Sequence, residues 1–376
     1  MTDKELRRRL AERLTEKGHL RSGPWRAAVE AVPRHEFLRG GFFERIDGDG
    51  PTAWRPVPAD GPRWLERCYD DESLVTQIAG TIVPADIRGE IMRAPTSSST
   101  MPGLVVRMHE DLQGEDGHKI LEVGSGSGYS TALLCERFGS RRVTSVEVDA
   151  GVAARARTAL GQIGYTPDLV DGDGLVGHRD GAPYDRLSVT CGVLAVPYEW
   201  VAQTRPGGMI LATVCGWMYS SELARLTVGE DGTATGRFLG GQISFMLARP
   251  HQPPPLGLLP DPDAGDERPA GLAADVLDDW NTRFVAQLAA PRAQKVGLTH
   301  DGRTEPLLID VAAGSWAALR QDGGGRWLVR QGGPARLWDD IEDHVRRWRA
   351  DGAPALEEFT VTVTPDGQSV TWPAKG

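Results

Sequence analysis

The residues with the clearest chemical meaning form a glycine-rich run that directly follows a short apolar segment. Leu121-Glu122-Val123 precedes Gly124-Ser125-Gly126-Ser127-Gly128, and a helical pattern begins at Tyr129. Gly124 and Gly126 carry no Cβ atom, so the backbone can approach a ligand there, with the N-terminus of the following helix facing it. Dinucleotide sites and structural turns share such runs, so the glycines alone leave the ligand open.

Carboxylates at three successive strand ends narrow the choice of ligand. Glu122 stands two residues before the first glycine, where its charge disfavours a pyrophosphate and can hold the ammonium group of a methionine moiety. Glu147 ends the next expected strand and can accept hydrogen bonds from both ribose hydroxyls, and Asp173 can meet the adenine amino group. Ligands of open α/β sheets bind at the carboxyl ends of the strands. The pattern therefore favours S-adenosylmethionine (SAM), with S-adenosylhomocysteine as product, over a nicotinamide cofactor. The predicted cofactor-binding residues are Glu122, Gly124, Ser125, Gly126, Gly128, Glu147, Val148, Gly172, Asp173 and Gly174.

Alternating periodicities predict the elements that position these residues. Buried strands are expected at 119–123, 143–148, 169–170, 186–190 and 209–214, and helices at 104–112, 130–138 and 152–160. Strands separated by helical stretches are typical of a parallel sheet covered on both faces. We therefore predict a doubly wound, Rossmann-like α/β domain, closed by a meander with strands at 223–228 and 245–249.

The segments on either side of this predicted domain differ from it in composition and periodicity. Two helices are expected within 1–40, followed by a Gly-, Pro- and Asp-rich stretch that ends in the polar string Thr96-Ser97-Ser98-Ser99-Thr100. A connection of that length predicts a lid or binding loop. Hairpin turns at Asp301-Gly302 and at 365–367, with an amphipathic helix between them, predict a smaller C-terminal α+β domain. The predicted divisions are 1–116 (helices and substrate loop), 117–250 (cofactor domain), 251–270 (Pro/Asp-rich linker) and 271–376 (C-terminal domain).

The composition excludes several classes of protein. The 376 residues carry a net charge of −10, which disfavours nucleic acid as a partner. No apolar run is long enough to span a membrane, and the charged N-terminus lacks a secretory signal, so a cytoplasmic protein is expected. The four cysteines form no CxxC pair, and no metal-ligand spacing surrounds His35 or His109, so no metal site is predicted.

Over residues 1–250 the chain resembles the protein-L-isoaspartate O-methyltransferase family. Several segments carry the resemblance in the family's order: Val32-Pro33-Arg34-His35-Glu36-Phe37, Tyr69-Asp70-Asp71, Met101–Met108, the run from Leu121 to Tyr129, Gly172-Asp173-Gly174 and Ala182-Pro183-Tyr184-Asp185. The family's active-site serine corresponds to Thr100 here. The resemblance therefore implies Thr100, with the adjoining Ser99, as the catalytic hydroxyls. An insertion after Gln77 and a C-terminal domain that ordinary repair enzymes of the family lack imply a remodelled acceptor side.

A narrower resemblance rests on Pro197-Tyr198-Glu199-Trp200, on Gln203–Gly208 and on the Thr96–Thr100 string. These features are similar to the methyltransferases that accompany ATP-grasp maturases in graspetide (ribosomal peptide) pathways. The resemblance implies methylation of an aspartate side chain in a precursor peptide already modified by an ATP-grasp ligase. The ester would then close to an aspartimide, and the C-terminal domain would recognise the precursor peptide.

The chemistry implied by this resemblance needs no general base. An aspartate carboxyl group has an ordinary pKa of about 3.9, so at neutral pH it is already the nucleophile. Two other functions stay open: repair of isoaspartate in aged proteins, and a non-catalytic SAM-binding subunit that recruits peptide. The Asn/Asp-Pro-Pro-Tyr motif of amino-base methylation is missing, which disfavours DNA as substrate. The oligomeric state is left open.

Overall fold

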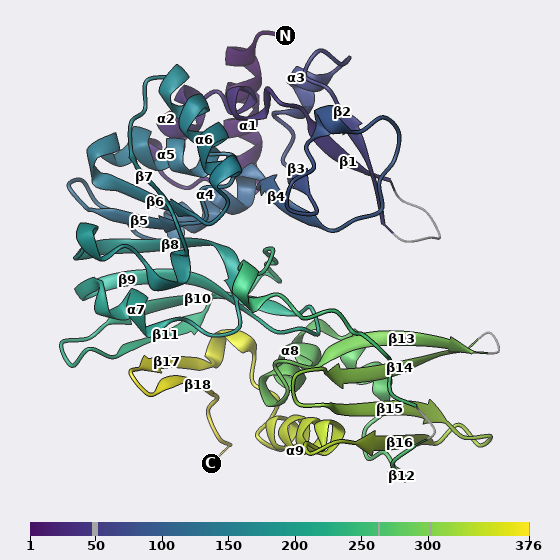
Figure 1. Cartoon of the computed structure of the whole chain (residues 1–376). Helices are drawn as coiled ribbons and strands as arrows, with labels where there is room; N and C mark the ends of the chain where they lie inside the picture. Colours follow the sequence, from purple (N-terminus) through teal and green to yellow (C-terminus); the bar gives the residue numbers. More distant parts are fainter. Residues whose placement is uncertain (47–51, 262–263, 301–302, 376) are drawn as a thin grey trace. The chain divides into compact units, whose positions relative to one another are not determined.

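The computed structural model describes residues 1–46, 52–261, 264–300 and 303–375. These residues form two compact units, drawn in Figure 1. The first unit comprises residues 1–190 and 199–211, and the second comprises residues 191–198 and 212–376. Strand β9 (Thr204–Cys215) contributes residues to both units.

A parallel sheet forms the centre of the first unit. Its strands are β5 (Ile120–Val123), β6 (Val143–Glu147), β7 (Asp168–Asp171) and β8 (Tyr184–Val193). The order β9-β8-β5-β6-β7 places β6 and β8 on opposite sides of β5, so the direction of winding reverses there. Helices α5 (Tyr129–Phe138) and α6 (Ala150–Gln162) connect successive strands. The predicted doubly wound fold is confirmed, and its switch point lies beside the glycine-rich turn.

The N-terminal helices complete the core of this unit. They are α1 (Asp3–Glu16), α2 (Gly23–Ala31), the short helix η1 (Arg34–Leu38) and, after the polar string 96–100, α4 (Pro102–Asp111). Thr2 and Glu5 form a capping box at the start of α1, and the fourfold spacing of Leu6, Leu10 and Leu14 buries one face. This face packs into the same apolar cluster as Trp25 and the leucines of α5.

The stretch from 41 to 100 is not the loop predicted from its composition. It forms a four-stranded antiparallel sheet in the order β2-β1-β3-β4. The strands are β1 (Phe42–Ile46), β2 (Ala53–Val57), β3 (Leu74–Ile78) and β4 (Pro95–Ser99), with α3 (Trp64–Arg67) and η2 (Pro84–Asp86) between them. Each strand has only five residues and two contain proline, so the sequence shows no alternating pattern long enough to predict them. The polar string 96–100 supplies most of β4.

The second unit contains the order β18-β17-β11-β10. These strands are β10 (Ser221–Val228), β11 (Ala234–Phe238), β17 (Thr360–Thr364) and β18 (Gly367–Thr371). The expected strand at 245–249 is absent, and β11 takes its place beside β10. The C-terminal hairpin β17–β18 pairs with β11 and so belongs to the same sheet as the meander.

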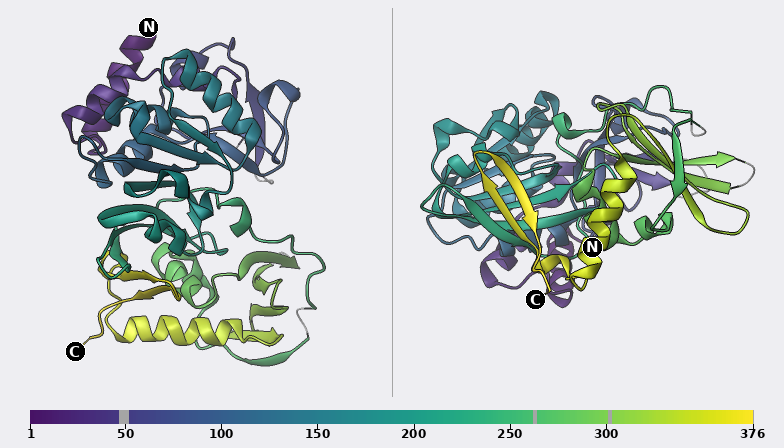
Figure 2. Two further views of the ribbon diagram at one scale, coloured as in Figure 1. Left: turned by 60° about the vertical axis from the view of Figure 1, so that its left-hand side comes forward. Right: turned by 90° about the horizontal axis from the view of Figure 1, so that it is seen from below.

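A five-stranded antiparallel sheet with two helices forms the rest of the second unit. Its order is β12-β16-β15-β14-β13. The strands are β12 (Asp266–Pro269), β13 (Gln294–His300), β14 (Arg303–Asp310), β15 (Ser315–Gln321) and β16 (Trp327–Gly332). Helix α9 (Leu337–Ala350) contacts β15, β16 and helix α8 (Trp280–Ala289) (Figure 2). The predicted turn at Asp301-Gly302 lies outside the described residues, although β13 and β14 pair as expected.

The predicted divisions of the chain therefore differ from the observed units. Residues 102–116 pack in the same unit as the cofactor sheet, while 212–250 belong with the C-terminal residues. Strand β12 begins inside the predicted linker and pairs with β16. Composition marks where a chain resists packing locally, but strand pairing across long separations decides which segments share a core.

The structure also bears on the expectations about membrane spans and cysteines. In the ranges that the structure describes, no helix has the length and apolar character needed to cross a membrane. The four cysteines are free thiols, and Cys68, Cys135 and Cys215 are buried as expected for small apolar side chains.

Candidate active site

The glycine-rich turn joins β5 to α5 through three residues with left-handed backbone. Gly124, Gly126 and Gly128 have φ angles of 95°, 52° and 95°. A Cβ atom on Gly124 would lie 2.6 Å from Thr190 Oγ1, and one on Gly128 would lie 3.2 Å from the Phe37 ring. At Gly126 the neighbour is the carbonyl oxygen of Ser98, at 3.2 Å. Glycine is thus required by both conformation and close packing, and the acceptor strand β4 reaches this turn.

The side chain of Glu122, predicted to hold the ammonium group of the methionine moiety, points into the protein interior. Its side chain is fully buried, and its carboxylate accepts hydrogen bonds from the hydroxyls of Ser130 (2.5 Å), Thr131 (2.5 Å) and Ser145 (2.7 Å). Burial raises the pKa of Glu122, while the three hydroxyl donors oppose that shift. The carboxylate therefore ties β5, β6 and α5 together beneath the glycine turn. It supports the turn, because hydroxyls of α5 and β6 surround its fully buried carboxylate.

Glu147 lies at the carboxyl end of β6, where the sequence predicts a contact to ribose. One carboxylate oxygen accepts from the Gly126 amide at 2.9 Å, and the other accepts from the Asp149 amide at 3.1 Å. A carboxylate has about four acceptor positions, so Glu147 can bind the turn and still accept from ligand hydroxyls. The neighbouring Val148 is 45% exposed, although it is a large apolar residue.

The end of β7 lies beside Glu147. The Gly172 amide donates to the Glu147 carbonyl at 2.9 Å. Asp173 is exposed, with one carboxylate oxygen accepting from the Leu175 amide. Gly174 is buried against Val123, where a Cβ would lie 2.5 Å from a Val123 methyl carbon. Most of the predicted cofactor residues thus follow one edge of the sheet. The exceptions are Glu122 and Ser125, whose side chains are buried, with the Ser125 hydroxyl bonded to that of Ser145.

The residues along this edge fit SAM. The left-handed turn glycines pack closely against Thr190, Ser98 and Phe37, and two carboxylates stand at adjacent strand ends. Val148 and Val176 are 45% and 57% exposed beside those carboxylates, which suits the faces of an adenine ring. The donor set contains no pyrophosphate-binding cation. Within the described ranges, no group of His, Cys, Asp and Glu could hold a metal ion.

The two predicted catalytic hydroxyls are placed differently from each other. Ser99 is 1% exposed, and its hydroxyl accepts a hydrogen bond from Arg34 Nε at 3.3 Å. Thr100 follows at the end of β4 and is partly exposed, and no described residue bonds its hydroxyl. The prediction that Ser99 shares the catalytic role is therefore not supported, because alternate residues of a strand face opposite sides and Ser99 faces inward. Thr100 is the hydroxyl available to a substrate.

Arg34 organises the acceptor side, a role that its local sequence does not predict. Its buried guanidinium donates to the carbonyls of Cys68 (3.0 Å), Asp70 (2.9 Å), Glu72 (2.9 Å), Ser99 (3.0 Å) and Thr100 (3.2 Å). Burial lowers its pKa from the usual value. These bonds join η1, the segment before β3 and the end of β4. The available signal was the Val32-Pro33-Arg34 segment, in which a basic residue directly follows apolar ones.

A second bridge joins the acceptor sheet to the end of β6. Gln77 is 2% exposed and accepts from the Thr96 hydroxyl at 2.9 Å. Its amide nitrogen donates to Asp149 at 3.2 Å, and Asp149 also caps α6 through the Val152 amide. Nothing in the sequence marks Gln77, since its role depends on pairing between β3 and β4. The Arg34 and Gln77 bonds together fix both ends of β4.

The histidines noted in the sequence are structural. His109 stacks on Trp25 with ring centroids 4.8 Å apart and contacts the Ser130 hydroxyl at 3.2 Å. Burial lowers the pKa of His109 to about 3, so the ring is neutral at physiological pH. His35 Nδ1 lies 2.7 Å from the Tyr69 hydroxyl, and burial also lowers its pKa.

Comparison with known proteins agrees with this site. Residues 76–240 match the family described as protein-L-isoaspartate(D-aspartate) O-methyltransferase. The protein-L-isoaspartate O-methyltransferase of Methanopyrus kandleri is 35% identical over 238 residues, covering 62% of this chain and 88% of the relative. That of Methanothermobacter thermautotrophicus is 30% identical over 247 residues, covering 65% and 96%.

A solved structure extends the likeness in fold to almost the whole chain. A protein titled protein-L-isoaspartate O-methyltransferase covers 97% of this chain and 99% of its own, with 20% identity and a TM-score of 0.56. The fold of the C-terminal residues is therefore shared with one solved protein of that title, whereas the two relatives above align to only 62% and 65% of this chain. From the relatives and the edge residues, the chain belongs to the protein-L-isoaspartate O-methyltransferase family and is a SAM-dependent methyltransferase.

Proposed function

We propose that this protein transfers the methyl group of SAM to the side-chain carboxylate of an aspartate residue in a peptide. The observation that carries the proposal is the placement of Thr100. Its hydroxyl has no partner among the described residues, and Arg34 holds the carbonyls of Ser99 and Thr100. The preceding Ser98 carbonyl lies against the Gly126 turn. A hydrogen-bond donor thus stands next to the cofactor turn.

This arrangement suits a carboxylate acceptor. When bound, SAM supplies an electrophilic methyl group on a sulfonium. An aspartate carboxylate is ionised at neutral pH, so the chain's residues need to orient it and need not deprotonate it. The Thr100 hydroxyl donates to one carboxylate oxygen and leaves the other free to attack. Glu147 and Asp173 hold the ribose and adenine, which fixes the direction of attack.

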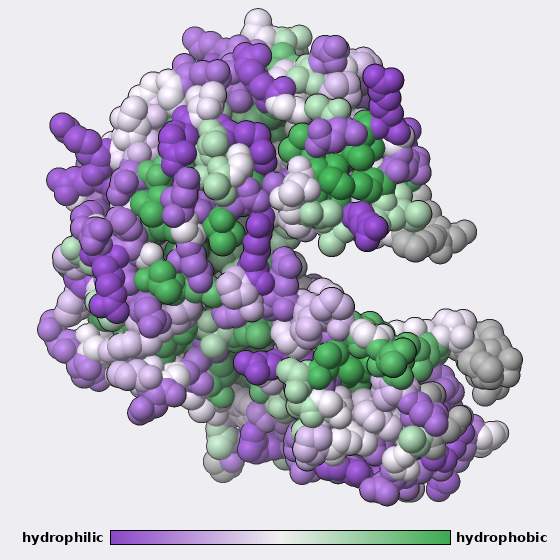
Figure 3. Space-filling view, viewed as in Figure 1, coloured by the Kyte–Doolittle hydropathy of each residue, from purple (hydrophilic) through white to green (hydrophobic). Residues whose placement is uncertain are grey.

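The finer proposal names the substrate as a ribosomally made precursor peptide already modified by an ATP-grasp ligase. After esterification, the neighbouring backbone nitrogen attacks the ester carbonyl, methanol leaves, and an aspartimide forms. Support comes from the insertion between Gln77 and β4. It contributes Ile82, Ile87 and Ile91, which with Trp54 pack partly buried against the buried residues Phe43, Val75 and Ile78 of β1 and β3. Figure 3 shows apolar side chains on this part of the molecule. The partly exposed side of the cluster belongs to the sheet of β4, where a bulky, cyclised peptide would rest.

Repair of isoaspartyl residues is the second candidate. The names of the relatives favour it, and the likeness of the whole chain to a solved enzyme of that name removes one argument against it. A third candidate, a non-catalytic SAM-binding subunit, has less support because the hydroxyl and the cofactor edge are both retained. In each case the partner is a peptide or protein. The net charge of −10 disfavours nucleic acid.

Intact mass spectrometry separates these candidates. The protein is incubated with SAM and three peptides: an ATP-grasp-cyclised precursor, its linear form and an isoaspartyl test peptide. We expect the cyclised precursor to gain one methyl group, or to lose one water after methanol release. Methylation of the isoaspartyl peptide alone would identify the protein as a repair enzyme. If no peptide were methylated, the result would favour the non-catalytic subunit.

Replacing Thr100 tests the residue that carries the proposal. Thr100→Val removes the hydroxyl at nearly constant volume, and we expect kcat to fall by roughly 10- to 100-fold, as for loss of one positioned donor. Thr100→Ser keeps the hydroxyl and should retain most of the activity. The SAM affinity of both variants, measured by calorimetry, should equal that of the parent. Equal activity in Thr100→Val and Thr100→Ser would remove Thr100 from the mechanism.

A further inference from the structure

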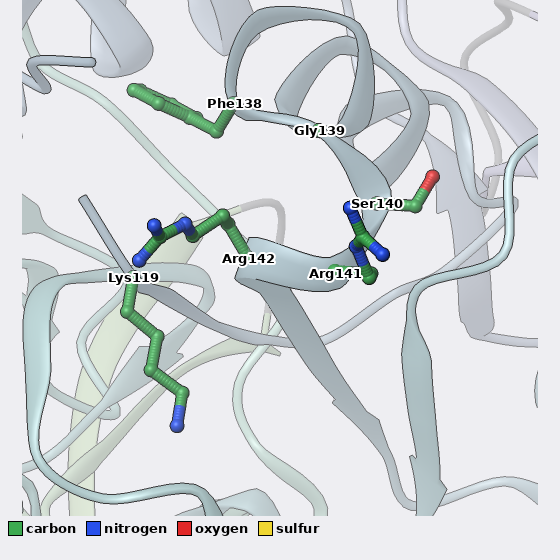
Figure 4. A pocket seen from close by; sticks show the side chains of 6 residues that line it. All are labelled: Lys119, Phe138, Gly139, Ser140, Arg141 and Arg142. Carbon is green, nitrogen blue, oxygen red and sulfur yellow. The ribbon is translucent and has the colours of Figure 1, made fainter. Parts of the chain in front are cut away.

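A cavity lies at the opposite end of the parallel sheet from the cofactor edge. It has a volume of about 680 Å³ and is lined by Lys119, Phe138, Gly139, Ser140, Arg141 and Arg142 (Figure 4). Lys119 directly precedes β5, and Arg142 directly precedes β6. The cofactor residues follow the carboxyl ends of the same two strands. This basic pocket is therefore separate from the methyl-transfer site.

The three cations of the basic pocket have no acidic partner among the described residues. Arg141 and Arg142 are exposed, and within the described residues their guanidinium groups take part in no ion pair or hydrogen bond. Lys119 Nζ lies over the Tyr184 ring, 5.5 Å from its centroid, and is likewise free of carboxylates. Figure 4 shows the Arg142 side chain extending from the start of β6 toward Lys119. The cavity thus concentrates positive charge that the chain itself does not neutralise.

Neighbouring basic residues differ from these three. Arg137, one residue before Phe138, pairs with Asp116, and Arg205 pairs with Asp185. Arg186 donates to the carbonyls of Leu112 and Gln113. The Asp185 carboxylate also lies beside the pocket, where it accepts from the Lys119 backbone amide at 2.7 Å. Among the described residues, no carboxylate pairs with the Lys119, Arg141 or Arg142 side chains, although the chain has a net charge of −10. Grouped cations repel one another, so an incoming anion would be stabilised there.

We propose that the basic pocket docks acidic side chains of the substrate peptide, at a distance from the aspartate that is methylated. This inference rests on the proposed function for the identity of the substrate. The volume matches that of ordinary ligand pockets and admits two or three carboxylate side chains. A long polyanion such as a nucleic acid would extend beyond the pocket, where the acidic surface of the protein would repel it. A short acidic peptide segment needs only the cations of the pocket.

The geometry sets a minimum spacing between the docked segment and the target. Lys119 and Gly124 are five residues apart along an extended strand, which is about 17 Å at 3.3 Å per residue. A peptide that follows the surface must cover at least that distance, so more than about five extended residues separate its acidic segment from the target aspartate. Shorter peptides can be methylated but cannot use the pocket.

Fluorescence anisotropy with a labelled hexaglutamate peptide tests the pocket without SAM. The test variant is Arg141→Glu/Arg142→Glu. The control is Arg8→Glu/Arg9→Glu on helix α1, an exposed pair with the same change of charge. We expect the Kd for hexaglutamate to rise about tenfold in the test variant and to stay within about twofold in the control. Equal weakening in both variants, or none in either, overturns the proposal. So does tighter binding of inorganic phosphate or an oligonucleotide than of hexaglutamate at the pocket.

Methylation assays separate this inference from the proposed function. The test variant should bind SAM and methylate a short isoaspartyl or aspartyl peptide as the parent does, which also shows that it is folded. It should have a raised KM, with unchanged kcat, for the same peptide carrying a distant glutamate-rich extension. An unchanged KM overturns the docking role. A parent protein that methylates no peptide overturns the proposed function, even where hexaglutamate binds the pocket.

Discussion

Arg34 is the residue on which the acceptor end of the site depends most directly, because it donates to five backbone carbonyls in two segments, 68–72 and 99–100. Arg34→Lys keeps the charge but replaces a planar fork with a single ammonium, leaving several buried carbonyls without donors. We expect the free energy of unfolding to fall by about 3 kcal/mol or more, measured by urea denaturation. Arg179→Lys, at an exposed position, should change it by less than about 0.5 kcal/mol. A smaller loss in Arg34→Lys than in this control would contradict the role of Arg34.

Glu122 predicts a dependence of stability on pH. Burial raises its pKa in the folded state above the unfolded value of about 4.3, so protonation favours folding. This contribution is fully present below the unfolded pKa and is lost as the pH rises through the folded pKa. Glu122→Gln removes the titration. Acidification from neutral pH toward pH ~5 should therefore stabilise the parent relative to Glu122→Gln, measured as the difference between their free energies of unfolding. A difference independent of pH would show that burial does not control this carboxyl group.

At the scale of elements, the β5–α5 turn and strand β4 meet at Gly126. Gly126→Ala places a methyl group 3.2 Å from the Ser98 carbonyl in a left-handed backbone conformation, so the turn or the strand must shift. We expect the SAM affinity, measured by calorimetry, to fall about tenfold or more. Gly164→Ala is a matched control, because φ is also positive (87°) but nothing lies within 4 Å of the added carbon. It should cost roughly 1 kcal/mol of stability and leave SAM affinity unchanged. Equal SAM affinity in the two variants would refute the contact.

At the scale of the whole molecule, the last strands of the chain complete a sheet begun more than a hundred residues earlier. Val361 on β17 is fully buried and pairs with Gly236 on β11. Val361→Asp buries an unpaired charge, and we expect a loss of about 3 kcal/mol or more in thermal or urea denaturation. Thr362→Asp, at the adjacent half-buried position, should cost much less. SAM affinity should persist in both variants, because the cofactor residues lie in the first unit. A loss of SAM binding in Val361→Asp would contradict that division.

The predictability of the site varied with the range of the interactions. The placement of the glycine run, Glu147 and Asp173 along one edge was predictable from sequence, because each lies at the end of a strand or within two residues after it. The acceptor side was less predictable. Thr100 was found through family resemblance, but Arg34 and Gln77 act on residues more than sixty positions away, and no local pattern encodes such contacts. The burial of Ser99 could not be predicted, because its orientation depends on the pairing of β4 with β3.

The sequence by itself determined the doubly wound core, the cofactor and the class of chemistry, since local periodicity and strand-end residues carry that information. Only the tertiary structure decided that the stretch from 41 to 100 is a sheet, that Glu122 is enclosed by hydroxyls, and that the C-terminal hairpin joins β11. The physical reason is the same in each case. Short strands, buried carboxylates and edge pairings are stabilised by partners distant in sequence, and their local residues do not specify those partners.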